Sequence, residues 1–393
     1  MQNVLRALIP LINECKEELR SQHVANALYG LQHMNSNVDE VRGVLRALTT
    51  KIKDCRQHFI GQAVSNSLIG LKNMSSDFKE VQGVLRELAT KIKDCTQMSA
   101  QEVGNSLYGL QNMSSDVKEV RSILRELVPK IRECKELSPQ SIGNALYGLQ
   151  NMNSDAEEVN AVIRELFPKI QKFKDIMIVQ SISNALFGLR SIKIDASSKD
   201  LLAALLKQLF LQVNEASSFD DLIVSYQTVA ILLNPSCKFA LSMRELSLFD
   251  YITEQSKRLY TLLYKHPHKA FKDTSENRTT SRVEDMFAKR LQEKLGNIPN
   301  IQISNNEYLK GFEADIVIRK RSVVDTEVVT VLNIELDGPS HKYDLTKKHF
   351  CVLRDEHLNR QHGIIIKRFE TSEVMHEKLE GIIDEVKYII ESI

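Results

Sequence analysis

Acidic residues gather at the ends of predicted strands in the last third of the chain. Asp315 lies in the predicted strand Ala314–Ile318, and Glu335 and Asp337 stand at the end of the next strand, Val328–Leu336. Metal-dependent phosphodiester hydrolysis needs carboxylates that converge on Mg²⁺ or Mn²⁺, because the ion activates water and stabilises the developing charge. One carboxylate on a strand and an acidic pair on its hairpin partner can converge in this way. The pattern therefore predicts a metal site built from these three residues.

Two neighbouring residues extend this candidate catalytic set. Glu284, on the predicted helix Ser281–Leu295, can add a fourth carboxylate, and His341 can act as a base or bind a phosphate. A structural interpretation is open beside this one. The segment 337–339 is Asp-Gly-Pro, which is common in turns, and Glu284 also suits a solvated helix start.

The elements around these acids indicate a separate domain over residues 280–393. The hydrophobic period changes there from that of helices to that of strands. The predicted order α-β-β-β-α-β-α favours a small mixed sheet flanked by helices. The remaining predicted elements are the strands Ile301–Ile303 and Gly363–Phe369 and the helices Lys347–His362 and Ser372–Glu391.

A second candidate site lies in the first half of the chain. Gln101, Asn105, Tyr108 and Asn112 are spaced by 4, 3 and 4 residues, which places them along one side of a helix. Amide groups pair with base edges and rings stack on bases, and helical-repeat proteins bind about one base per repeat. Five copies therefore predict a site for about five nucleotides of single-stranded RNA. The other copies are Gln22, Asn26, Tyr29 and His33; Gln62, Asn66, Ile69 and Asn73; Gln140, Asn144, Tyr147 and Asn151; and Gln180, Asn184, Phe187 and Ser191.

The residues alone leave other roles open for these positions. Asparagines could bond between neighbouring repeats, tyrosines could pack in the core, and a peptide-binding protein would present a similar face. Base selection fits best at the rows that vary between copies, such as those of Tyr29 and His33. Basic residues of the second helices could meet phosphates or form a solvated face; they are Lys51, Lys53, Lys91, Lys93, Lys130, Arg132 and Lys169.

These rows belong to an internal repeat that predicts an α-solenoid over residues 1–192. The anchor asparagines recur at steps of 40, 39, 39 and 40 residues, and each repeat contains two amphipathic helical phrases. Such a unit cannot bury its apolar faces alone, so neighbouring units must stack. The chain opens with a second phrase, Val4–Cys15, which indicates either an unusual cap or a protein that extends further upstream. The anchors are Asn26, Asn66, Asn105, Asn144 and Asn184.

Glycine and cysteine also recur once per repeat. A glycine inside a helix costs about 1 kcal/mol relative to alanine, so its recurrence predicts close approach of neighbouring helices. The cysteines lack the Cys-x-x-Cys spacing of zinc sites, which favours a role as small buried filler. The glycines are Gly30, Gly70, Gly109, Gly148 and Gly188, and the cysteines are Cys15, Cys55, Cys95 and Cys134.

The middle of the chain and its composition give weaker indications. Residues 193–279 are expected to form a degenerate helical cap and a linker, with Phe219–Leu233 as a decayed repeat. There are 52 Lys and Arg against 51 Asp and Glu, so no overall cationic field indicates a polyanionic partner. No apolar stretch suits a membrane span and no secretion signal is evident, so we expect a cytoplasmic protein that does not associate with a membrane. We also expect no small-molecule cofactor. An effector or organellar destination stays open.

The repeat resembles the octotricopeptide-type repeat of organellar and bacterial RNA-processing proteins. The resemblance covers residues 1–192 and is carried by the phrase Gln-x-x-x-Asn-Ser/Ala-Leu-Tyr-Gly-Leu and by the length of the period. Those repeats carry tryptophan where this chain has tyrosine or phenylalanine, and the chain contains no tryptophan. RNA binding is what this resemblance implies.

The end of the chain resembles the RAP domain, which often closes octotricopeptide-type proteins. The resemblance is carried by Glu335–His341, Lys348, and Arg354-Asp355 with Leu358 and Gly363. The same region is similar to the very-short-patch-repair branch of the PD-(D/E)xK nuclease fold, a restriction-endonuclease-like fold. That similarity implies that Asp315 is the acidic strand residue and that Asp337 replaces the usual lysine.

Together these resemblances imply an RNA-binding solenoid joined to a metal-dependent endoribonuclease. Mg²⁺ or Mn²⁺ would be held by Asp315, Glu335 and Asp337, assisted by Glu284 and His341. One alternative is a non-catalytic RNA-binding factor that stabilises or matures transcripts. Another is a protein-interaction solenoid.

Overall fold

The computed structural model describes residues 2–171, 177–194, 199–266, 282–322, 329–338, 345–375 and 378–392. Its contacts divide the chain into two compact units, the first of Met1–Asn214 with Pro235–Thr253, the second of Glu215–Asn234 with Glu254–Ile393. The chain is mostly helical and has a small C-terminal four-stranded mixed sheet. Among the described helices, none combines the length and apolar character needed to cross a membrane.

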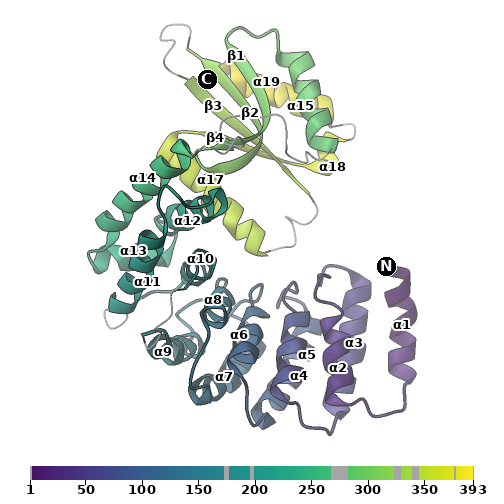
Figure 1. Ribbon diagram of the computed structural model, residues 1–393. Coiled ribbons are helices and arrows are strands. Elements are labelled where there is room, and N and C mark those ends of the chain that lie inside the picture. Colours follow the sequence, from purple (N-terminus) through teal and green to yellow (C-terminus); the bar gives the residue numbers. More distant parts are fainter. Residues whose placement is uncertain are drawn as a thin grey trace. The chain divides into compact units, whose positions relative to one another are not determined.

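Two layers of helices build most of the first unit (Figure 1). Helices of the first phrase pack on one another in one layer, and helices of the second phrase do so in the other. The predicted alternation of two helices per repeat is therefore present. The first-phrase helices are α2 (Ser21–Tyr29), α4 (Gly61–Gly70), α6 (Ala100–Tyr108), α8 (Pro139–Tyr147) and α10 (Val179–Gly188). The second-phrase helices are α1 (Gln2–Glu14), α3 (Asp39–Asp54), α5 (Lys79–Asp94), α7 (Lys118–Glu133) and α9 (Glu157–Gln171).

The recurring glycines let the first-phrase helices touch through their backbones. A Cβ built on Gly70, Gly109, Gly148 or Gly188 would lie 2.0–2.3 Å from a carbonyl oxygen of the preceding first-phrase helix. Gly30 has no such neighbour, and its nearest atoms are 3.5 Å away in its own helix. The predicted close approach of helices is confirmed at these four positions.

The recurring cysteines are mostly core residues. Cys55, Cys95 and Cys134 are buried, and Cys15 is half-buried. Burial raises the pKa of the Cys95 and Cys134 thiols above its ordinary value. The predicted role as small buried filler is confirmed for these three.

Four helices follow the repeats and are shared between the two units. Helix α11 (Lys199–Gln212), α13 (Lys238–Glu245) and the start of α14 (Phe249–Lys265) belong to the first unit. Helix α12 (Phe219–Leu232), expected to be a decayed repeat, belongs to the second. Residues 267–279 of the predicted cap and linker lie outside the described residues.

The second unit contains the sheet, in the order β1-β2-β3-β4. Its first three strands are antiparallel and the fourth runs parallel to β3. The predicted order of elements is confirmed, with β1 and β2 longer than predicted and with the last helix divided in two. The elements are α15 (Arg282–Leu295), β1 (Ile301–Leu309), β2 (Phe312–Arg321), β3 (Val329–Asp337), α17 (Leu345–His362), β4 (Ile365–Glu370), α18 (Thr371–Val374) and α19 (Leu379–Ser392).

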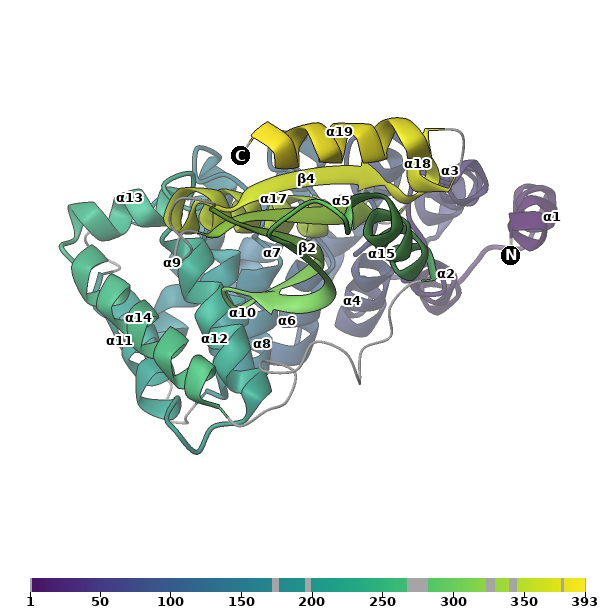
Figure 2. The same ribbon diagram turned by 90° about the horizontal axis from the view of Figure 1, so that it is seen from above.

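Strand alternation separates an apolar face of the sheet from a polar one. Ile316, Ile334 and Phe369 pack with side chains of α15 and α19 in one core cluster, and α19 runs along β4 in Figure 2. Because side chains alternate along a strand, Glu335 and Arg368 point to the opposite face. That face carries Asp315, Glu335 and Asp337.

Candidate functional site

The first-phrase helices present the amide and aromatic residues as four parallel rows. The glutamine row is exposed in every copy, and the asparagine row is exposed or half-buried. We call the third row the ring row and the fourth the lower row. The glutamine row is Gln22, Gln62, Gln101, Gln140 and Gln180; the asparagine row is Asn26, Asn66, Asn105, Asn144 and Asn184. The ring row is Tyr29, Ile69, Tyr108, Tyr147 and Phe187; the lower row is His33, Asn73, Asn112, Asn151 and Ser191.

Three members of the ring row stack on one another. The ring centroids of Tyr108 and Tyr147 are 5.8 Å apart, those of Tyr147 and Phe187 are 6.0 Å apart, and both pairs are inclined by 27°. The Arg190 guanidinium lies 4.2 Å from the centroid of Phe187. Exposure falls along the row, from 41% at Tyr29 to 8% at Phe187. The row therefore offers aromatic surface mainly at its N-terminal end.

The lower row forms contacts between repeats. The side-chain amides of Asn73, Asn112 and Asn151 donate to backbone carbonyl oxygens of the preceding repeat at 2.8, 3.0 and 2.7 Å. Asn112 is also only 4% exposed. The structural alternative therefore applies to these three asparagines, whereas His33 of the same row is exposed. The physical reason is that each amide satisfies a carbonyl in the turn between helices.

One lysine per repeat is also used inside the solenoid. The Lys51 ammonium donates to the carbonyl oxygen of Cys15, and that of Lys91 donates to Cys55, both at 2.6 Å. Cys55 is the C-cap of α3, so the cation lies where the helix dipole favours positive charge. The same contact recurs for Lys130 and Lys169, which donate to Cys95 and Cys134. These four lysines, considered above as phosphate ligands, therefore have a structural role as donors to the carbonyl groups at helix ends.

Ion pairs join successive second-phrase helices. Arg86 and Glu119 lie 2.7 Å apart, and the hydrogen bond from Arg46 holds the pKa of Glu80 below its ordinary value. Arg6–Glu40, Arg125–Glu158 and Arg132–Glu165 are corresponding pairs. These charges balance one another along the layer of second-phrase helices. This layer therefore has less net positive charge than its lysines and arginines suggest.

In the second unit, Asp315 on β2 lies beside Glu335 on β3. One carboxylate oxygen of Asp315 accepts a hydrogen bond from the backbone N–H of Leu336 at 2.8 Å. Burial, followed by the negative charges of Glu335 and Glu284, raises the pKa of Asp315 to about 7. The negative charges of Glu335 and Glu284 therefore both act on the Asp315 carboxyl.

Glu335 is buried but paired with a cation. Its carboxylate lies 2.7 Å from the Arg354 guanidinium, and it accepts a hydrogen bond from Asn333 at 2.8 Å. Only 4% of Glu335 is exposed, so this arginine compensates a charge that solvent barely reaches.

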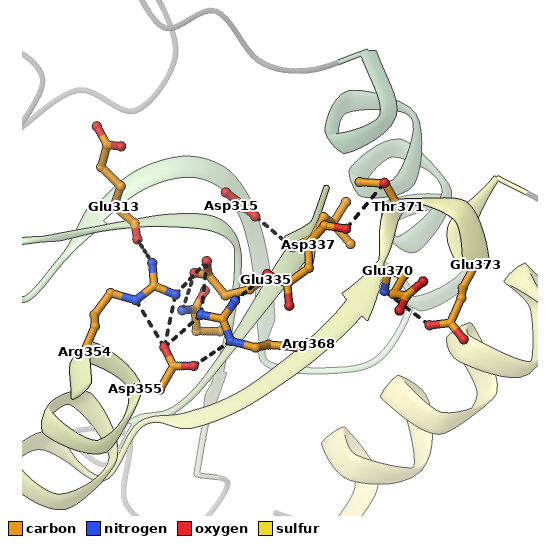
Figure 3. A network of polar contacts seen from close by, with 12 residues as sticks. Glu313, Asp315, Glu335, Asp337, Arg354, Asp355, Arg368, Glu370, Thr371 and Glu373 are labelled. Carbon is orange, nitrogen blue, oxygen red and sulfur yellow. Dashed lines mark hydrogen bonds and ion pairs between the residues drawn. The ribbon is translucent and has the colours of Figure 1, made fainter. Parts of the chain in front are cut away.

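The third predicted metal ligand, Asp337, is held by a second arginine. Arg368 lies 2.6 Å from Asp337 and 2.6 Å from Asp355, and Asp355 also accepts hydrogen bonds from Arg354. Figure 3 shows Asp355 between the two guanidinium groups, while Asp315 lies apart from this chain of ion pairs. Acids and arginines thus alternate from Asp337 to Glu335.

Sequence reasoning did not assign roles to Arg354, Asp355 and Arg368. Arg354 and Asp355 stand in the motif that resembles the RAP domain, so a signal was available for them. Arg368 gives no such signal, because only the parallel register of β3 and β4, in which it pairs with Glu335, brings it to the site. His341 lies outside the described residues.

These residues fit a divalent cation only in part. Asp315 and Glu335 are neighbouring carboxylates, but Arg354 already pairs with Glu335 and Arg368 already pairs with Asp337. Over the described part of the chain, no group of three or more His, Cys, Asp and Glu residues has the arrangement of a metal site.

Comparison with known proteins adds no relative. A search with models of protein families finds no match to the chain, and a search of curated proteins finds none either.

Proposed function

We propose that the chain binds single-stranded RNA through the ring, asparagine and glutamine rows of its solenoid. The observation that carries the proposal is the row of aromatic side chains, with Tyr29 41% exposed at one end. Rings stack on any unpaired base, and base–ring stacking contributes about 1–3 kcal/mol per base. We propose further that the repeat is of the octotricopeptide type and that the site takes up to about five nucleotides.

The neighbouring amide rows support a preference among bases. The glutamine row is exposed in all five copies, and a side-chain amide can both donate to and accept from a base edge. With a formal net charge of +1, the chain has little long-range attraction for phosphates. Affinity would therefore depend on stacking more than on charge, with a shallow dependence on salt.

Fluorescence anisotropy with labelled ten-nucleotide A, C and U homopolymers tests this proposal. Binding that Tyr29→Ala and Tyr108→Ala each weaken by tenfold or more supports it. Tyr388→Ala is the matched control, because this tyrosine is 73% exposed but belongs to α19 of the second unit and not to the repeats. A wild-type chain that binds none of the oligomers supports a protein-interaction solenoid instead.

The second unit supports a second candidate function, metal-dependent RNA cleavage by a RAP-like domain of restriction-endonuclease-like fold. The favouring observation is that the buried Asp315 carboxyl lies beside Glu335 and that burial and the neighbouring acids raise its pKa to about 7. Mg²⁺ or Mn²⁺ would be held there by Asp315 and Glu335, with Asp337 as a third ligand if Arg368 moves away. The ion would supply activated water. Glu284 lies near enough to Asp315 to strengthen the site's attraction for a cation.

The arginine pairs favour the non-catalytic alternative, in which the same domain grips RNA without cutting it. Arg354 and Arg368 already supply positive charge to Glu335 and Asp337. Incubation of RNA with the protein in Mg²⁺ or EDTA separates the two. Cleavage that requires Mg²⁺ and is lost in Asp315→Ala, but kept in Glu313→Gln on the same strand, supports the nuclease. Binding without cleavage supports the alternative.

A further inference from the structure

The ring row is interrupted once, at Ile69 of α4. Below this point Tyr108, Tyr147 and Phe187 form a continuous column, and the Arg190 guanidinium covers the last ring. Arg190 is itself buried at 2% exposure and donates to Gln150 and Asn151, so this end of the column is closed by protein. The other end, at Tyr108, faces an aliphatic residue.

The column has no room for a base between its rings. A base inserted between two rings needs two stacking distances of about 3.4 Å each, or roughly 7 Å. The observed centroid separations are 5.8 and 6.0 Å. Insertion would therefore have to separate helices α6, α8 and α10, whose backbones already touch at Gly148 and Gly188. Rigid backbone contacts of this kind oppose such a separation.

The interruption at Ile69 leaves a wider interval between aromatic rings than the column does. Tyr29 and Tyr108 are two repeats apart, and two steps of the ring spacing found between Tyr108, Tyr147 and Phe187 would span roughly 12 Å. A stack of ring, base, base and ring needs three stacking distances, or about 10 Å. Ile69 is shorter than a tyrosine, so the outer part of the Tyr108 ring extends beyond it. Tyr29 is the most exposed aromatic residue of the row.

Amide groups surround this position. Gln22, Gln62 and Gln101 are exposed at the starts of helices α2, α4 and α6, and Asn66 and Asn105 are half-buried beside Ile69 and Tyr108. Such groups can bond the edges of bases that stack on the rings. Aromatic walls and polar edges therefore meet at one place on the solenoid.

We propose that the principal nucleotide site is this interruption, where two adjacent bases of single-stranded RNA stack between Tyr29 and Tyr108 over Ile69. This inference rests on the proposed RNA-binding function and sharpens it. The closed column below Tyr108 then supports the site and takes up no bases of its own. It replaces uniform binding of one base per repeat with a dinucleotide anchor in the N-terminal half of the solenoid.

The decisive variant is Ile69→Tyr, measured by anisotropy on the ten-nucleotide A, C and U oligomers. It completes the ring row, so the proposed site is filled and the Kd is expected to rise at least tenfold. Binding of one base per repeat would instead gain a ring and give an equal or lower Kd. That result would overturn the inference while the RNA-binding function stood.

Two further measurements protect the test against a folding defect. Tyr147→Ile removes a ring from inside the column that only supports the site, so its Kd is expected to rise by less than that of Tyr108→Ala. A rise as large as that of Tyr108→Ala would contradict the inference. In wild-type protein, a 2-aminopurine pair within the preferred oligomer is expected to lose fluorescence on binding, and Ile69→Tyr should abolish this quenching. A wild-type chain that binds no oligomer overturns both the inference and the function beneath it.

Discussion

Replacing Gly109 by alanine tests how the solenoid is held together. The added Cβ would lie 2.3 Å from the carbonyl oxygen and 2.4 Å from the carbonyl carbon of Leu68, and 2.9 Å from the backbone nitrogen of Ile69. Carbon atoms in ordinary contact lie about 3.5–4.0 Å apart. Helices α4 and α6 must therefore move apart by about 1 Å, because the obstructing atoms are backbone and cannot change rotamer.

The size of the effect follows from two opposed terms. Overpacking of a well-packed interface costs about 1–3 kcal/mol, and the better helix propensity of alanine returns less than about 1 kcal/mol. We expect a net loss of about 1–2 kcal/mol in the free energy of unfolding. Gly30→Ala is the matched control, because Gly30 has the same place in its repeat and an αR conformation, and the atoms nearest to an added Cβ are 3.5 Å away in its own helix. It should be neutral or stabilise by up to about 1 kcal/mol.

Urea unfolding followed by circular dichroism measures both variants in the full chain. Solenoids can unfold in segments, so hydrogen exchange of α4 and α6 provides the local measurement. Faster exchange in these two helices for Gly109→Ala, and unchanged exchange in α2 for Gly30→Ala, is the expected pattern. Equal effects of the two substitutions would refute the argument that glycine recurs because the helices touch.

Two other perturbations have expected outcomes. In metal-free buffer the free energy of unfolding should fall by about 2–3 kcal/mol between pH 5 and pH 8. The reason is that the pKa of Asp315 is about 7 in the folded state and about 3.9 in the unfolded state, so the folded protein holds this proton more tightly and loses that advantage as the pH rises. Urea midpoints at the two pH values should show this fall in wild type and a flatter profile in Asp315→Asn; parallel profiles would contradict it. Lys91→Met should cost about 1–2 kcal/mol, since the Cys55 carbonyl at the helix end loses its cationic donor, whereas exposed Lys93→Met should change stability by less than about 0.5 kcal/mol. Equal thermal shifts for the two lysine variants would count against the predicted contact.

The repeat could be predicted because its signals are local and recur. Apolar spacing marked both helices, and the recurring glycines indicated close packing that the backbone contact of Gly109 with Leu68 confirms. The order of strands and helices in the last domain was likewise predictable from changes in hydrophobic period. The assignment of α12 to the second unit was not, because it depends on long-range contacts such as the hydrogen bond from Gln227 to Gly311 at 2.9 Å.

The polar sites were predictable only in part. The sequence placed Asp315 and Glu335 together, but it gave no indication that Arg368 would pair with Asp337, since that contact depends on the register of a parallel strand pair. The lower row shows the same limit. Asn112 has the spacing of a surface residue on its helix, yet the neighbouring repeat buries it and accepts its amide proton.

The central claim is that unpaired bases stack on the first-phrase helices at Tyr29 and Tyr108. Ultraviolet crosslinking of the bound RNA oligomer, followed by mass spectrometry of the crosslinked peptides, locates the contact directly. We expect crosslinks in the peptides that contain α2 and α6, centred on these two tyrosines. Crosslinks confined to the second-phrase helices α3, α5 and α7 would contradict the claim.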